Sequence, residues 1–243
     1  MKEIKKKSVN PSTMLYPVPA VMVSCGDMEN SNIITVAWTG IINSEPPYTY
    51  VSIRRERFSH DIIDESGEFV INITTEQLAK ATDYCGVKSG RDVDKFKETG
   101  LTKVAADVVK CPLIGESPVN LECKVFERHK FPTHDMYMAE IVAVHVNEDL
   151  FEGGKIKLED ANLLSYVHGE YFGLKKNPLG FFGYSIAKPK TLKKKNKEAH
   201  EKRVEKNREK RKKQALAENE SKHAAQGKKG KAAAPKKRKY ADK

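Results

Sequence analysis

The sequence predicts a mainly β fold, a small β-barrel with helical insertions. At least six short segments alternate apolar and polar residues, which is typical of half-buried strands. The helical patterns between them are few and short, which favours a barrel over a layered α/β sheet, and the G-x-G-x-x-G motif of a βαβ fold is absent. By composition the 243 residues divide into a lead-in (1–15), a body (16–189) and a Lys/Arg-rich tail (190–243).

The first predicted strands surround the only tryptophan. Val21–Cys25 and the segment beginning at Ser31 flank a turn and form a predicted hairpin. Residues 31–47 predict a strand, a break near Trp38, a short strand and a stop at two prolines, which lack the N–H that a ladder needs. Free backbone N–H groups beside Trp38 would suit a planar ligand with polar edges, and a buried core tryptophan is the alternative.

The next strand, Tyr48–Arg54, leads into a turn rich in arginine. Ser59 is placed to cap a predicted helix over 60–66 that stops at Gly67. Cations and a helix N-terminus together predict a phosphate site, because free N–H groups and positive charge converge there. A solvated arginine-rich surface is the alternative.

The middle of the chain predicts one central strand and two helices. Glu68–Thr74 is apolar except for Asn72, and residues 76–84 and 93–99 have helical patterns, the second ending at Gly100. A polar loop with two glycines, 83–96, enters the second helix, and loops of this kind often line sites.

The remainder of the body predicts further strands. Residues 119–129 and 136–147 alternate as a half-exposed antiparallel pair. We expect a loop over 149–160, a last short element over 166–174, and an aromatic, glycine-rich closing stretch over 177–186.

The net charge of +11 arises in the tail. Residues 188–243 contain 23 Lys/Arg and 7 Asp/Glu, whereas residues 1–187 contain 21 and 26. The tail has too few large apolar residues to pack as a domain; we expect a transient or ligand-induced helix over 198–226 and disorder over 227–243. Such a polycation predicts nonspecific binding to nucleic acid or another polyanion, with a solubilising extension as the alternative.

Cys25, Cys85, Cys111 and Cys123 lie far apart with no C-x-x-C motif, so neither zinc nor an iron–sulfur cluster is predicted. The sequence has no predicted secretion signal or membrane span. We therefore expect a cytoplasmic protein with reduced cysteines and no membrane partner.

Several strings, taken in order, carry a resemblance to a known family. They are Asn32-Ile-Ile-Thr-Val-Ala-Trp-Thr-Gly40, Pro46-Pro47, Ser52-Ile-Arg54 with Arg57-Phe-Ser-His60, Phe69-Val-Ile-Asn72, and Asp83-Tyr-Cys-Gly-Val-Lys-Ser-Gly90 with Asp94-Lys-Phe96. From about Tyr16 to Pro189 the sequence resembles the flavin reductase-like, flavoredoxin-type family of FMN-binding split barrels. The tail lies outside this resemblance.

The resemblance implies noncovalent FMN at a homodimer interface, and electron or hydride transfer from NAD(P)H or a reduced ferredoxin-like carrier to an acceptor. The flavin would carry the chemistry, so no catalytic residue is expected. By position, the implied cofactor-binding residues are Asn32, Thr35, Ala37 and Trp38 beside the ring; Arg54, Ser59 and His60 at the phosphate; Asn72, Ser89 and Lys95 along the polar edge; and, without an assigned role, Thr39 and Ser52, with His134 as a weaker candidate.

Some of these assignments have alternatives. Lys95 would stabilise reduced flavin or be a solvated helix lysine, and His134, like an aromatic among Tyr166, Tyr171 and Phe172, is a weaker candidate for reaching a neighbouring flavin. Cys85 would have a redox role or be a small buried hydrophobe. The alternative function is a nonenzymatic FMN-binding or redox-sensing module tethered to nucleic acid by its tail.

Overall fold

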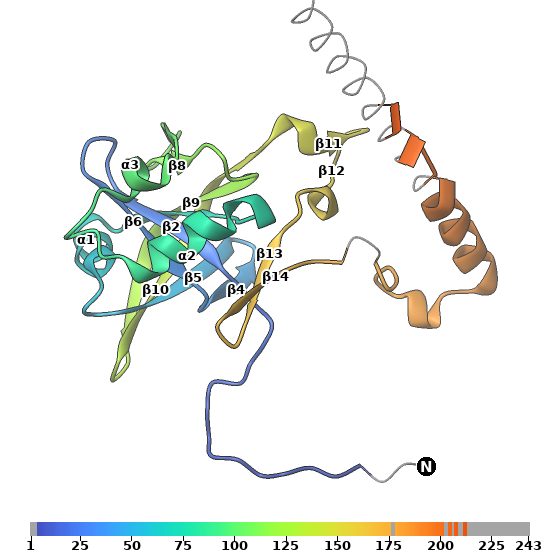
Figure 1. Ribbon diagram of the computed structural model, residues 1–243, viewed down its shortest axis with the longest axis horizontal. Coiled ribbons are helices and arrows are strands. Elements are labelled where there is room, and N and C mark those ends of the chain that lie inside the picture. Colours follow the sequence, from blue (N-terminus) through green and yellow to red (C-terminus); the bar gives the residue numbers. More distant parts are fainter. Residues whose placement is uncertain (1–3, 176–177, 202–203, 206, 209–210, 213–243) are drawn as a thin grey trace, which may run out of the picture. The chain divides into compact units, whose positions relative to one another are not determined.

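The computed structural model describes residues 4–175, 178–201, 204–205, 207–208 and 211–212. The chain forms two compact units, Met1–Asn177 and Pro178–Lys243. The first unit contains the strands and the three labelled α-helices (Figure 1).

Seven antiparallel strands form the main sheet of the first unit. In spatial order they are β3 (Ser31–Val36), β2 (Val21–Gly26), β6 (Glu68–Asn72), β9 (Val119–Lys130), β10 (His134–Val146), β5 (Pro47–Arg54) and β4 (Thr39–Ser44). The predicted strands and the β2–β3 hairpin are confirmed.

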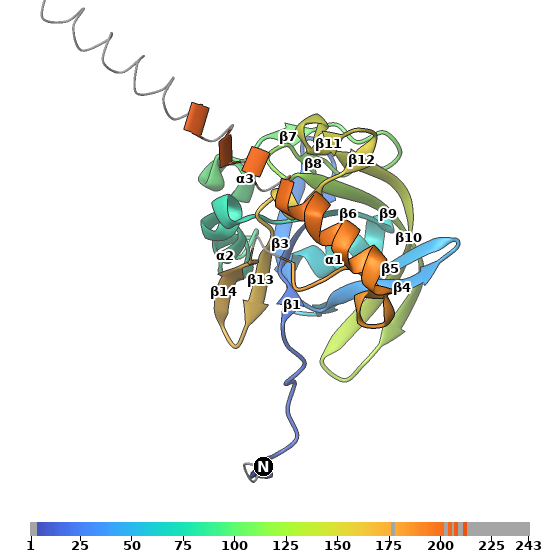
Figure 2. The same cartoon turned by 90° about the vertical axis from the view of Figure 1, so that its right-hand side faces the viewer.

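The two edges of this sheet meet, so the sheet is a barrel. β3 and β4 stand at opposite ends of the spatial order, yet only Ala37 and Trp38 join them. Val36 and Thr39 are therefore three Cα–Cα steps apart, about 11 Å at most, so the end of β3 and the start of β4 must lie close together. The Ser52 amide donates to the Trp38 carbonyl at 2.9 Å where the chain crosses between the edges. Figure 2 shows the curved sheet, with the long β9–β10 hairpin extending from it.

The helices of the first unit follow two of the barrel strands. α1 (Phe58–Ser66) connects β5 to β6, whereas η1 (Glu76–Leu78), α2 (Ala79–Val87) and α3 (Lys95–Thr99) follow β6. Gly67 and Gly100 end α1 and α3 with φ of 67° and 69°, a left-handed conformation that favours glycine. Both predicted stops are confirmed. The predicted loop over 83–96 is shorter than expected, because α2 continues to Val87.

Apolar side chains pack on both sides of β2 and β3. Val23, Ile34 and Phe69 belong to a cluster that includes residues of six barrel strands. Met22 and Ile33 belong to a second cluster with residues of α2 and α3. The central strands are therefore apolar on both faces, and the helices that cover β3 come close enough to form a site.

Short strands complete the first unit. β1 (Val18–Pro19), β13 (Leu164–Val167) and β14 (Glu170–Gly173) form one small sheet, and β7 (Lys103–Val104) pairs with β8 (Leu113–Ile114). The loop predicted over 149–160 instead contains η2 (Glu148–Leu150), the hairpin strands β11 (Phe151–Glu152) and β12 (Lys155–Ile156), and η3 (Leu158–Asp160).

The second unit contains η4 (Tyr184–Ile186) and a helix that begins at residue 189 and continues to 201. The described residues 204–205, 207–208 and 211–212 are also helical. The helix therefore starts before the predicted residue 198, while the expectations for residues 213–243 lie outside the described residues. Within the described part of the chain, no helix is long and apolar enough to cross a membrane.

Candidate functional site

A cleft of about 110 Å³ lies beside β3, and we name it the Asn32 cleft. Its walls come from β3, the start of α1, the end of α2, the loop after α2 and the start of α3. The lining residues are Asn32, Ile34, Glu56, Arg57, Phe58, Ser59, Cys85, Gly86, Lys88, Ser89, Gly90 and Lys95. The barrel thus brings four predicted site residues together: Asn32, Ser59, Ser89 and Lys95.

The start of α1 makes one end of the Asn32 cleft electropositive. The first amides of a helix have no partner within the helix, so they direct partial positive charge outward. Arg57 is the N-cap residue, and its exposed guanidinium and the exposed Lys88 ammonium add two cations. Helix amides and cations at one point form a site that suits a phosphate group.

Ser59 supports this site differently from the prediction. The helix begins one residue before Ser59, and no side chain caps it, so the predicted Ser59 cap is wrong. Ser59 lies in the first turn, where its hydroxyl accepts a hydrogen bond from the Asn32 amide at 2.8 Å. Because both side chains are buried, this bond fixes the orientation of Asn32 in the wall of the cleft.

Two glycines let the end of α2 and the loop after it approach β3. A Cβ at Gly90 would lie 2.2 Å from Asn32 Oδ1 and 2.8 Å from the Phe58 ring. A Cβ at Gly86 would lie 3.2 Å from Thr35 Cβ. The narrow shape of the Asn32 cleft therefore depends on glycine at residue 90, and less strictly at residue 86.

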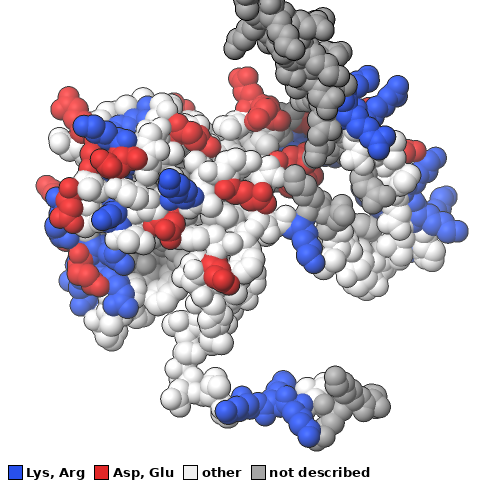
Figure 3. Space-filling view, in the orientation of Figure 1, with Lys and Arg blue, Asp and Glu red and all other residues white. Residues whose placement is uncertain are grey.

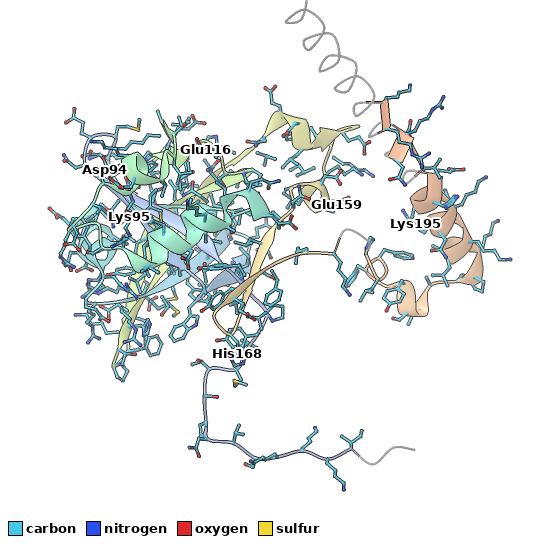
Figure 4. All side chains as sticks on the ribbon, viewed as in Figure 1. Asp94, Lys95, Glu116, Glu159, His168 and Lys195 are labelled. Carbon is cyan, nitrogen blue, oxygen red and sulfur yellow. The ribbon has the colours of Figure 1, made fainter. Side chains whose placement is uncertain are left out.

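Lys95 is buried in the cleft wall, so its interpretation as a solvated helix lysine is wrong. Its ammonium donates to the carbonyls of Ile33 at 2.6 Å and Cys85 at 2.8 Å, and so joins β3 to α2 (Figure 4). Desolvation by burial lowers the Lys95 pKa from its ordinary value. A lysine has three N–H donors, which leaves one for a group in the cleft.

A second group of predicted residues lies where β3 crosses to β4, and we name it the Trp38 rim: Trp38, Thr39, Ser52, Arg54 and His134. The Trp38 and His134 rings lie 4.6 Å apart between centroids, and Arg54 is the partner of His134 across β5 and β10. Burial and the nearby Arg54 charge lower the His134 pKa. Trp38 is 42% exposed, so a buried core tryptophan is excluded.

β3 connects the Asn32 cleft to the Trp38 rim. Asn32 and Trp38 are six positions apart in the sequence, a distance of about 20 Å at most along an extended chain. Between them, the Thr35 hydroxyl donates to the Thr82 carbonyl of α2 at 2.5 Å, and Ala37 is partly buried. An elongated ligand could therefore place an anionic end at the cleft and a flat ring at the rim.

The structure places His60 and Asn72 away from the lining of the Asn32 cleft. His60 Nε2 lies 3.1 Å from the buried carboxylate of Asp135, behind the first turn of α1. Asn72 is fully buried in the core, where it accepts from the Ile114 amide at 3.0 Å and donates to the Met22 carbonyl at 3.0 Å. Both side chains therefore already have polar partners within the fold.

Of the cleft residues that the sequence analysis did not assign to the site, Arg57, Lys88 and Gly90 bear most directly on its charge and shape. Arg54 was chosen for the phosphate, but it lies on the Trp38 rim. The useful signal was the position of each arginine relative to the start of the helix, since only Arg57 directly precedes it.

Cys85 lines the cleft as a buried thiol. Burial raises its pKa from 9.0 to about 11, so the sulfur is protonated and weakly nucleophilic near neutral pH. This favours the small-hydrophobe interpretation over a redox role.

A separate polar cluster joins Asp107, Glu122 and His145. The buried Glu122 carboxylate accepts from three backbone amides, at 2.8, 2.8 and 2.9 Å, and lies 2.6 Å from His145 Nε2. Both carboxylate oxygens are thus engaged in holding residues 107–109 to the sheet, and we assign the cluster a structural role.

Known proteins share this fold. An uncharacterised protein of Archaeoglobus fulgidus is 31% identical over 168 residues, covering 69% of this chain and 92% of that protein. Flavoredoxin of Desulfovibrio vulgaris (Miyazaki F) is 30% identical with a TM-score of 0.69, covering 74% of this chain and all of the other. An FMN-binding protein from Thermus thermophilus is 23% identical with a TM-score of 0.62, a likeness of fold.

The barrel is a flavin reductase-like split barrel. The model of the flavin reductase like domain matches residues 13–175, and the chain belongs to that family. It is a flavin-binding redox protein of the oxidoreductase type.

Proposed function

We propose that this protein is an FMN-dependent oxidoreductase that binds the FMN phosphate in the Asn32 cleft and the flavin ring at the Trp38 rim. The observation that carries the proposal is the convergence of the α1 N-terminus, Arg57 and Lys88 at one end of β3. At the other end, Trp38 offers an exposed aromatic face.

The residues of the cleft fit this cofactor by chemistry. Arg57, Lys88, Ser89 and the first amides of α1 would bind the phosphate dianion, and Asn32 would donate or accept along the polar part of the ligand. The backbone at Ala37 and the Trp38 ring would orient the flavin. Bound FMN supplies the hydride or electron transfer, and the protein supplies position and electrostatic field.

We also propose a homodimer that completes the site. A cleft of about 110 Å³ is small for a whole FMN, and the rim is open to solvent. Ile41 and Ile42 on β4, with exposures of 69% and 47%, leave apolar surface next to the rim along the chain. A second copy covering β4 would bury this surface and enclose the flavin ring.

The experiment that tests the proposal compares FMN with riboflavin, which lacks the phosphate. We expect purified protein to be yellow and to release FMN on acid treatment. Arg57→Ala should weaken FMN binding about tenfold to a hundredfold, the value of a charge-assisted hydrogen bond, and leave riboflavin binding unchanged. Lys124→Ala is the matched control, because it removes one exposed positive charge of the first unit outside both the cleft and the rim.

Two results would contradict the proposal. One is a colourless protein that also fails to bind added FMN. The other is an equal effect of Arg57→Ala on FMN and riboflavin, because a phosphate contact affects only the phosphorylated ligand.

The electron donor is proposed as NAD(P)H or a reduced ferredoxin-like carrier. The alternative function is a binding-only module in which flavin stores or reports redox state and the tail tethers the protein to a polyanion. Steady turnover of NAD(P)H or reduced ferredoxin with an added acceptor supports the oxidoreductase, whereas tight FMN binding with negligible turnover supports the alternative.

A further inference from the structure

We propose that the basic helix of the second unit binds the phosphate backbone of duplex DNA by lying in the major groove. By basic helix we mean the continuous helical residues 189–201 of the second unit. This proposal is independent of the flavin site, since no residue of the cleft or rim belongs to the second unit.

The charges of the basic helix are exposed and surround it. Lys193, Lys194 and Lys195 are consecutive, so at about 100° per residue they project in three directions. Figure 3 shows Lys and Arg gathered on this helix, and Figure 4 shows its side chains, Lys195 among them, spreading outward. A helix in a groove has phosphates on both sides, so cations on all its faces suit a groove better than a flat surface.

Ion pairs within the helix use a minority of these cations. Lys195 lies 3.5 Å from Glu198, and Lys197 lies 3.9 Å from Glu201, spacings that support a helix. Among residues 189–201, the other cations have no acidic partner within ion-pair distance. They are Lys190, Lys193 and Lys194.

Other polyanions fit this helix less well. Its one large apolar residue is Leu192, too little for the apolar face that a membrane surface requires. It has no Phe, Tyr or Trp, the side chains that form stacking platforms for single-stranded bases. The deep, narrow major groove of duplex RNA does not admit a helix, whereas that of B-form DNA does.

The dimensions also agree. A helix of 13 residues is about 20 Å long and about 10–12 Å across with its side chains, and the major groove of B-form DNA is about 12 Å wide. Because phosphates supply the contacts, we expect no sequence preference and a steep dependence on salt.

The test measures binding of the full-length protein to a fluorescein-labelled DNA duplex of mixed sequence, by anisotropy, between about 50 and 200 mM salt. The triple variant Lys190→Gln, Lys193→Gln, Lys194→Gln should lower the slope of log K against log salt by about 2.5, since each lost phosphate contact contributes about 0.9. The matched control, Lys80→Gln, Lys124→Gln, Lys130→Gln, changes exposed lysines of the first unit and should leave the slope unchanged.

A second variant tests the helical fit. Ala199→Pro keeps every charge and breaks the helix, because proline lacks the N–H and clashes with the preceding turn. We expect the intact protein to prefer duplex DNA over duplex RNA of the same sequence, and the proline variant to lose that preference. The preference should not depend on whether FMN is bound.

Three outcomes would overturn the proposal. If the control triple variant lowers the slope of log K against log salt by the same amount, DNA binding depends on the net charge of the protein and not on the basic helix. Equal affinity of the intact protein for duplex DNA and duplex RNA would exclude binding of the helix in the major groove. Competition by an acidic polypeptide or an anionic vesicle as strong as that by DNA of equal charge would indicate another class of partner.

Discussion

Lys95 and Asn32 are polar side chains that the fold buries and holds with defined partners. The Lys95 ammonium bonds two carbonyls, and the Asn32 amide bonds the Ser59 hydroxyl. Buried polar groups with satisfied hydrogen bonds adopt one geometry, because breaking such a hydrogen bond leaves a buried donor or acceptor without a partner, which costs free energy. The polar wall of the cleft is therefore formed before a ligand arrives.

Gly90 is the single residue on which the shape of this wall depends most. We expect Gly90→Ala to displace Asn32, to weaken FMN binding, and to lower the free energy of unfolding by about 1–3 kcal/mol, the usual effect of overpacking. FMN titration and urea unfolding measure both effects.

Gly86→Ala is the matched comparison, since the new methyl would meet Thr35 at 3.2 Å and needs only a small shift. An equal or larger effect at residue 86 would contradict the assigned role of Gly90.

The buried cysteines predict a loss of stability at alkaline pH. Burial raises the thiol pKa from 9.0 to about 11 for Cys25 and Cys85 and about 12 for Cys111. Above about pH 9 the unfolded chain releases thiol protons that the folded chain keeps, so stability falls until the folded pKa values are reached. We expect Tm to fall above pH 9, and to fall less in Cys85→Ala.

At the scale of secondary structure, α1 is held in place from behind its first turn. Arg55 Nε and His60 Nε2 both contact the buried Asp135 carboxylate of β10, at 2.9 and 3.1 Å. Burial opposes ionisation of Asp135, but the hydrogen bonds from His60 and Arg55 outweigh it, so the carboxyl pKa is lowered. This link fixes the helix whose amides face the cleft.

Asp135→Asn tests the link. We expect a loss of about 1–3 kcal/mol of stability, because the buried His60 ring and the half-exposed Arg55 guanidinium lose the carboxylate that they contact, together with weaker FMN binding as α1 moves. The stability from Asp135 should be present above about pH 4, near the ordinary carboxyl pKa, and be lost as pH falls through the lowered folded value.

Asp61→Asn is the control, since Asp61 also contacts His60, at 3.1 Å, but is exposed. A loss as large as that of Asp135→Asn would show that His60, rather than the buried carboxylate, positions the helix.

At the scale of the whole molecule, the proposed homodimer depends on the exposed residues of β4. If a second copy covers β4, Ile41→Asp with Ile42→Asp should convert the dimer to a monomer and lower flavin retention, because a buried unpaired charge is costly. Light scattering reports mass, and gel filtration with visible absorption reports retained flavin.

Ile156→Asp provides the control, because Ile156 is similarly exposed on β12, away from the cleft and the rim. A wild-type protein of monomeric mass that retains FMN would contradict the proposed dimer.

The prediction of elements was accurate where the local pattern has one physical meaning. Gly67 and Gly100 end helices because only glycine adopts the left-handed conformation easily, and the pattern around Trp38 shows the break between strands. Ser59 was misassigned because a serine before a helical pattern resembles a cap until the first residue of the helix is known.

The sequence by itself determined the β character, the flavin reductase-like family and the separation of an acidic body from a basic tail, since these follow from periodicity, ordered motifs and charge. Only the tertiary structure decided which polar residues meet. It placed Arg57 at the cleft, Arg54 at the rim and Asn72 in the core. Barrel closure brings together residues that are far apart in sequence, and local patterns hold no information on such contacts.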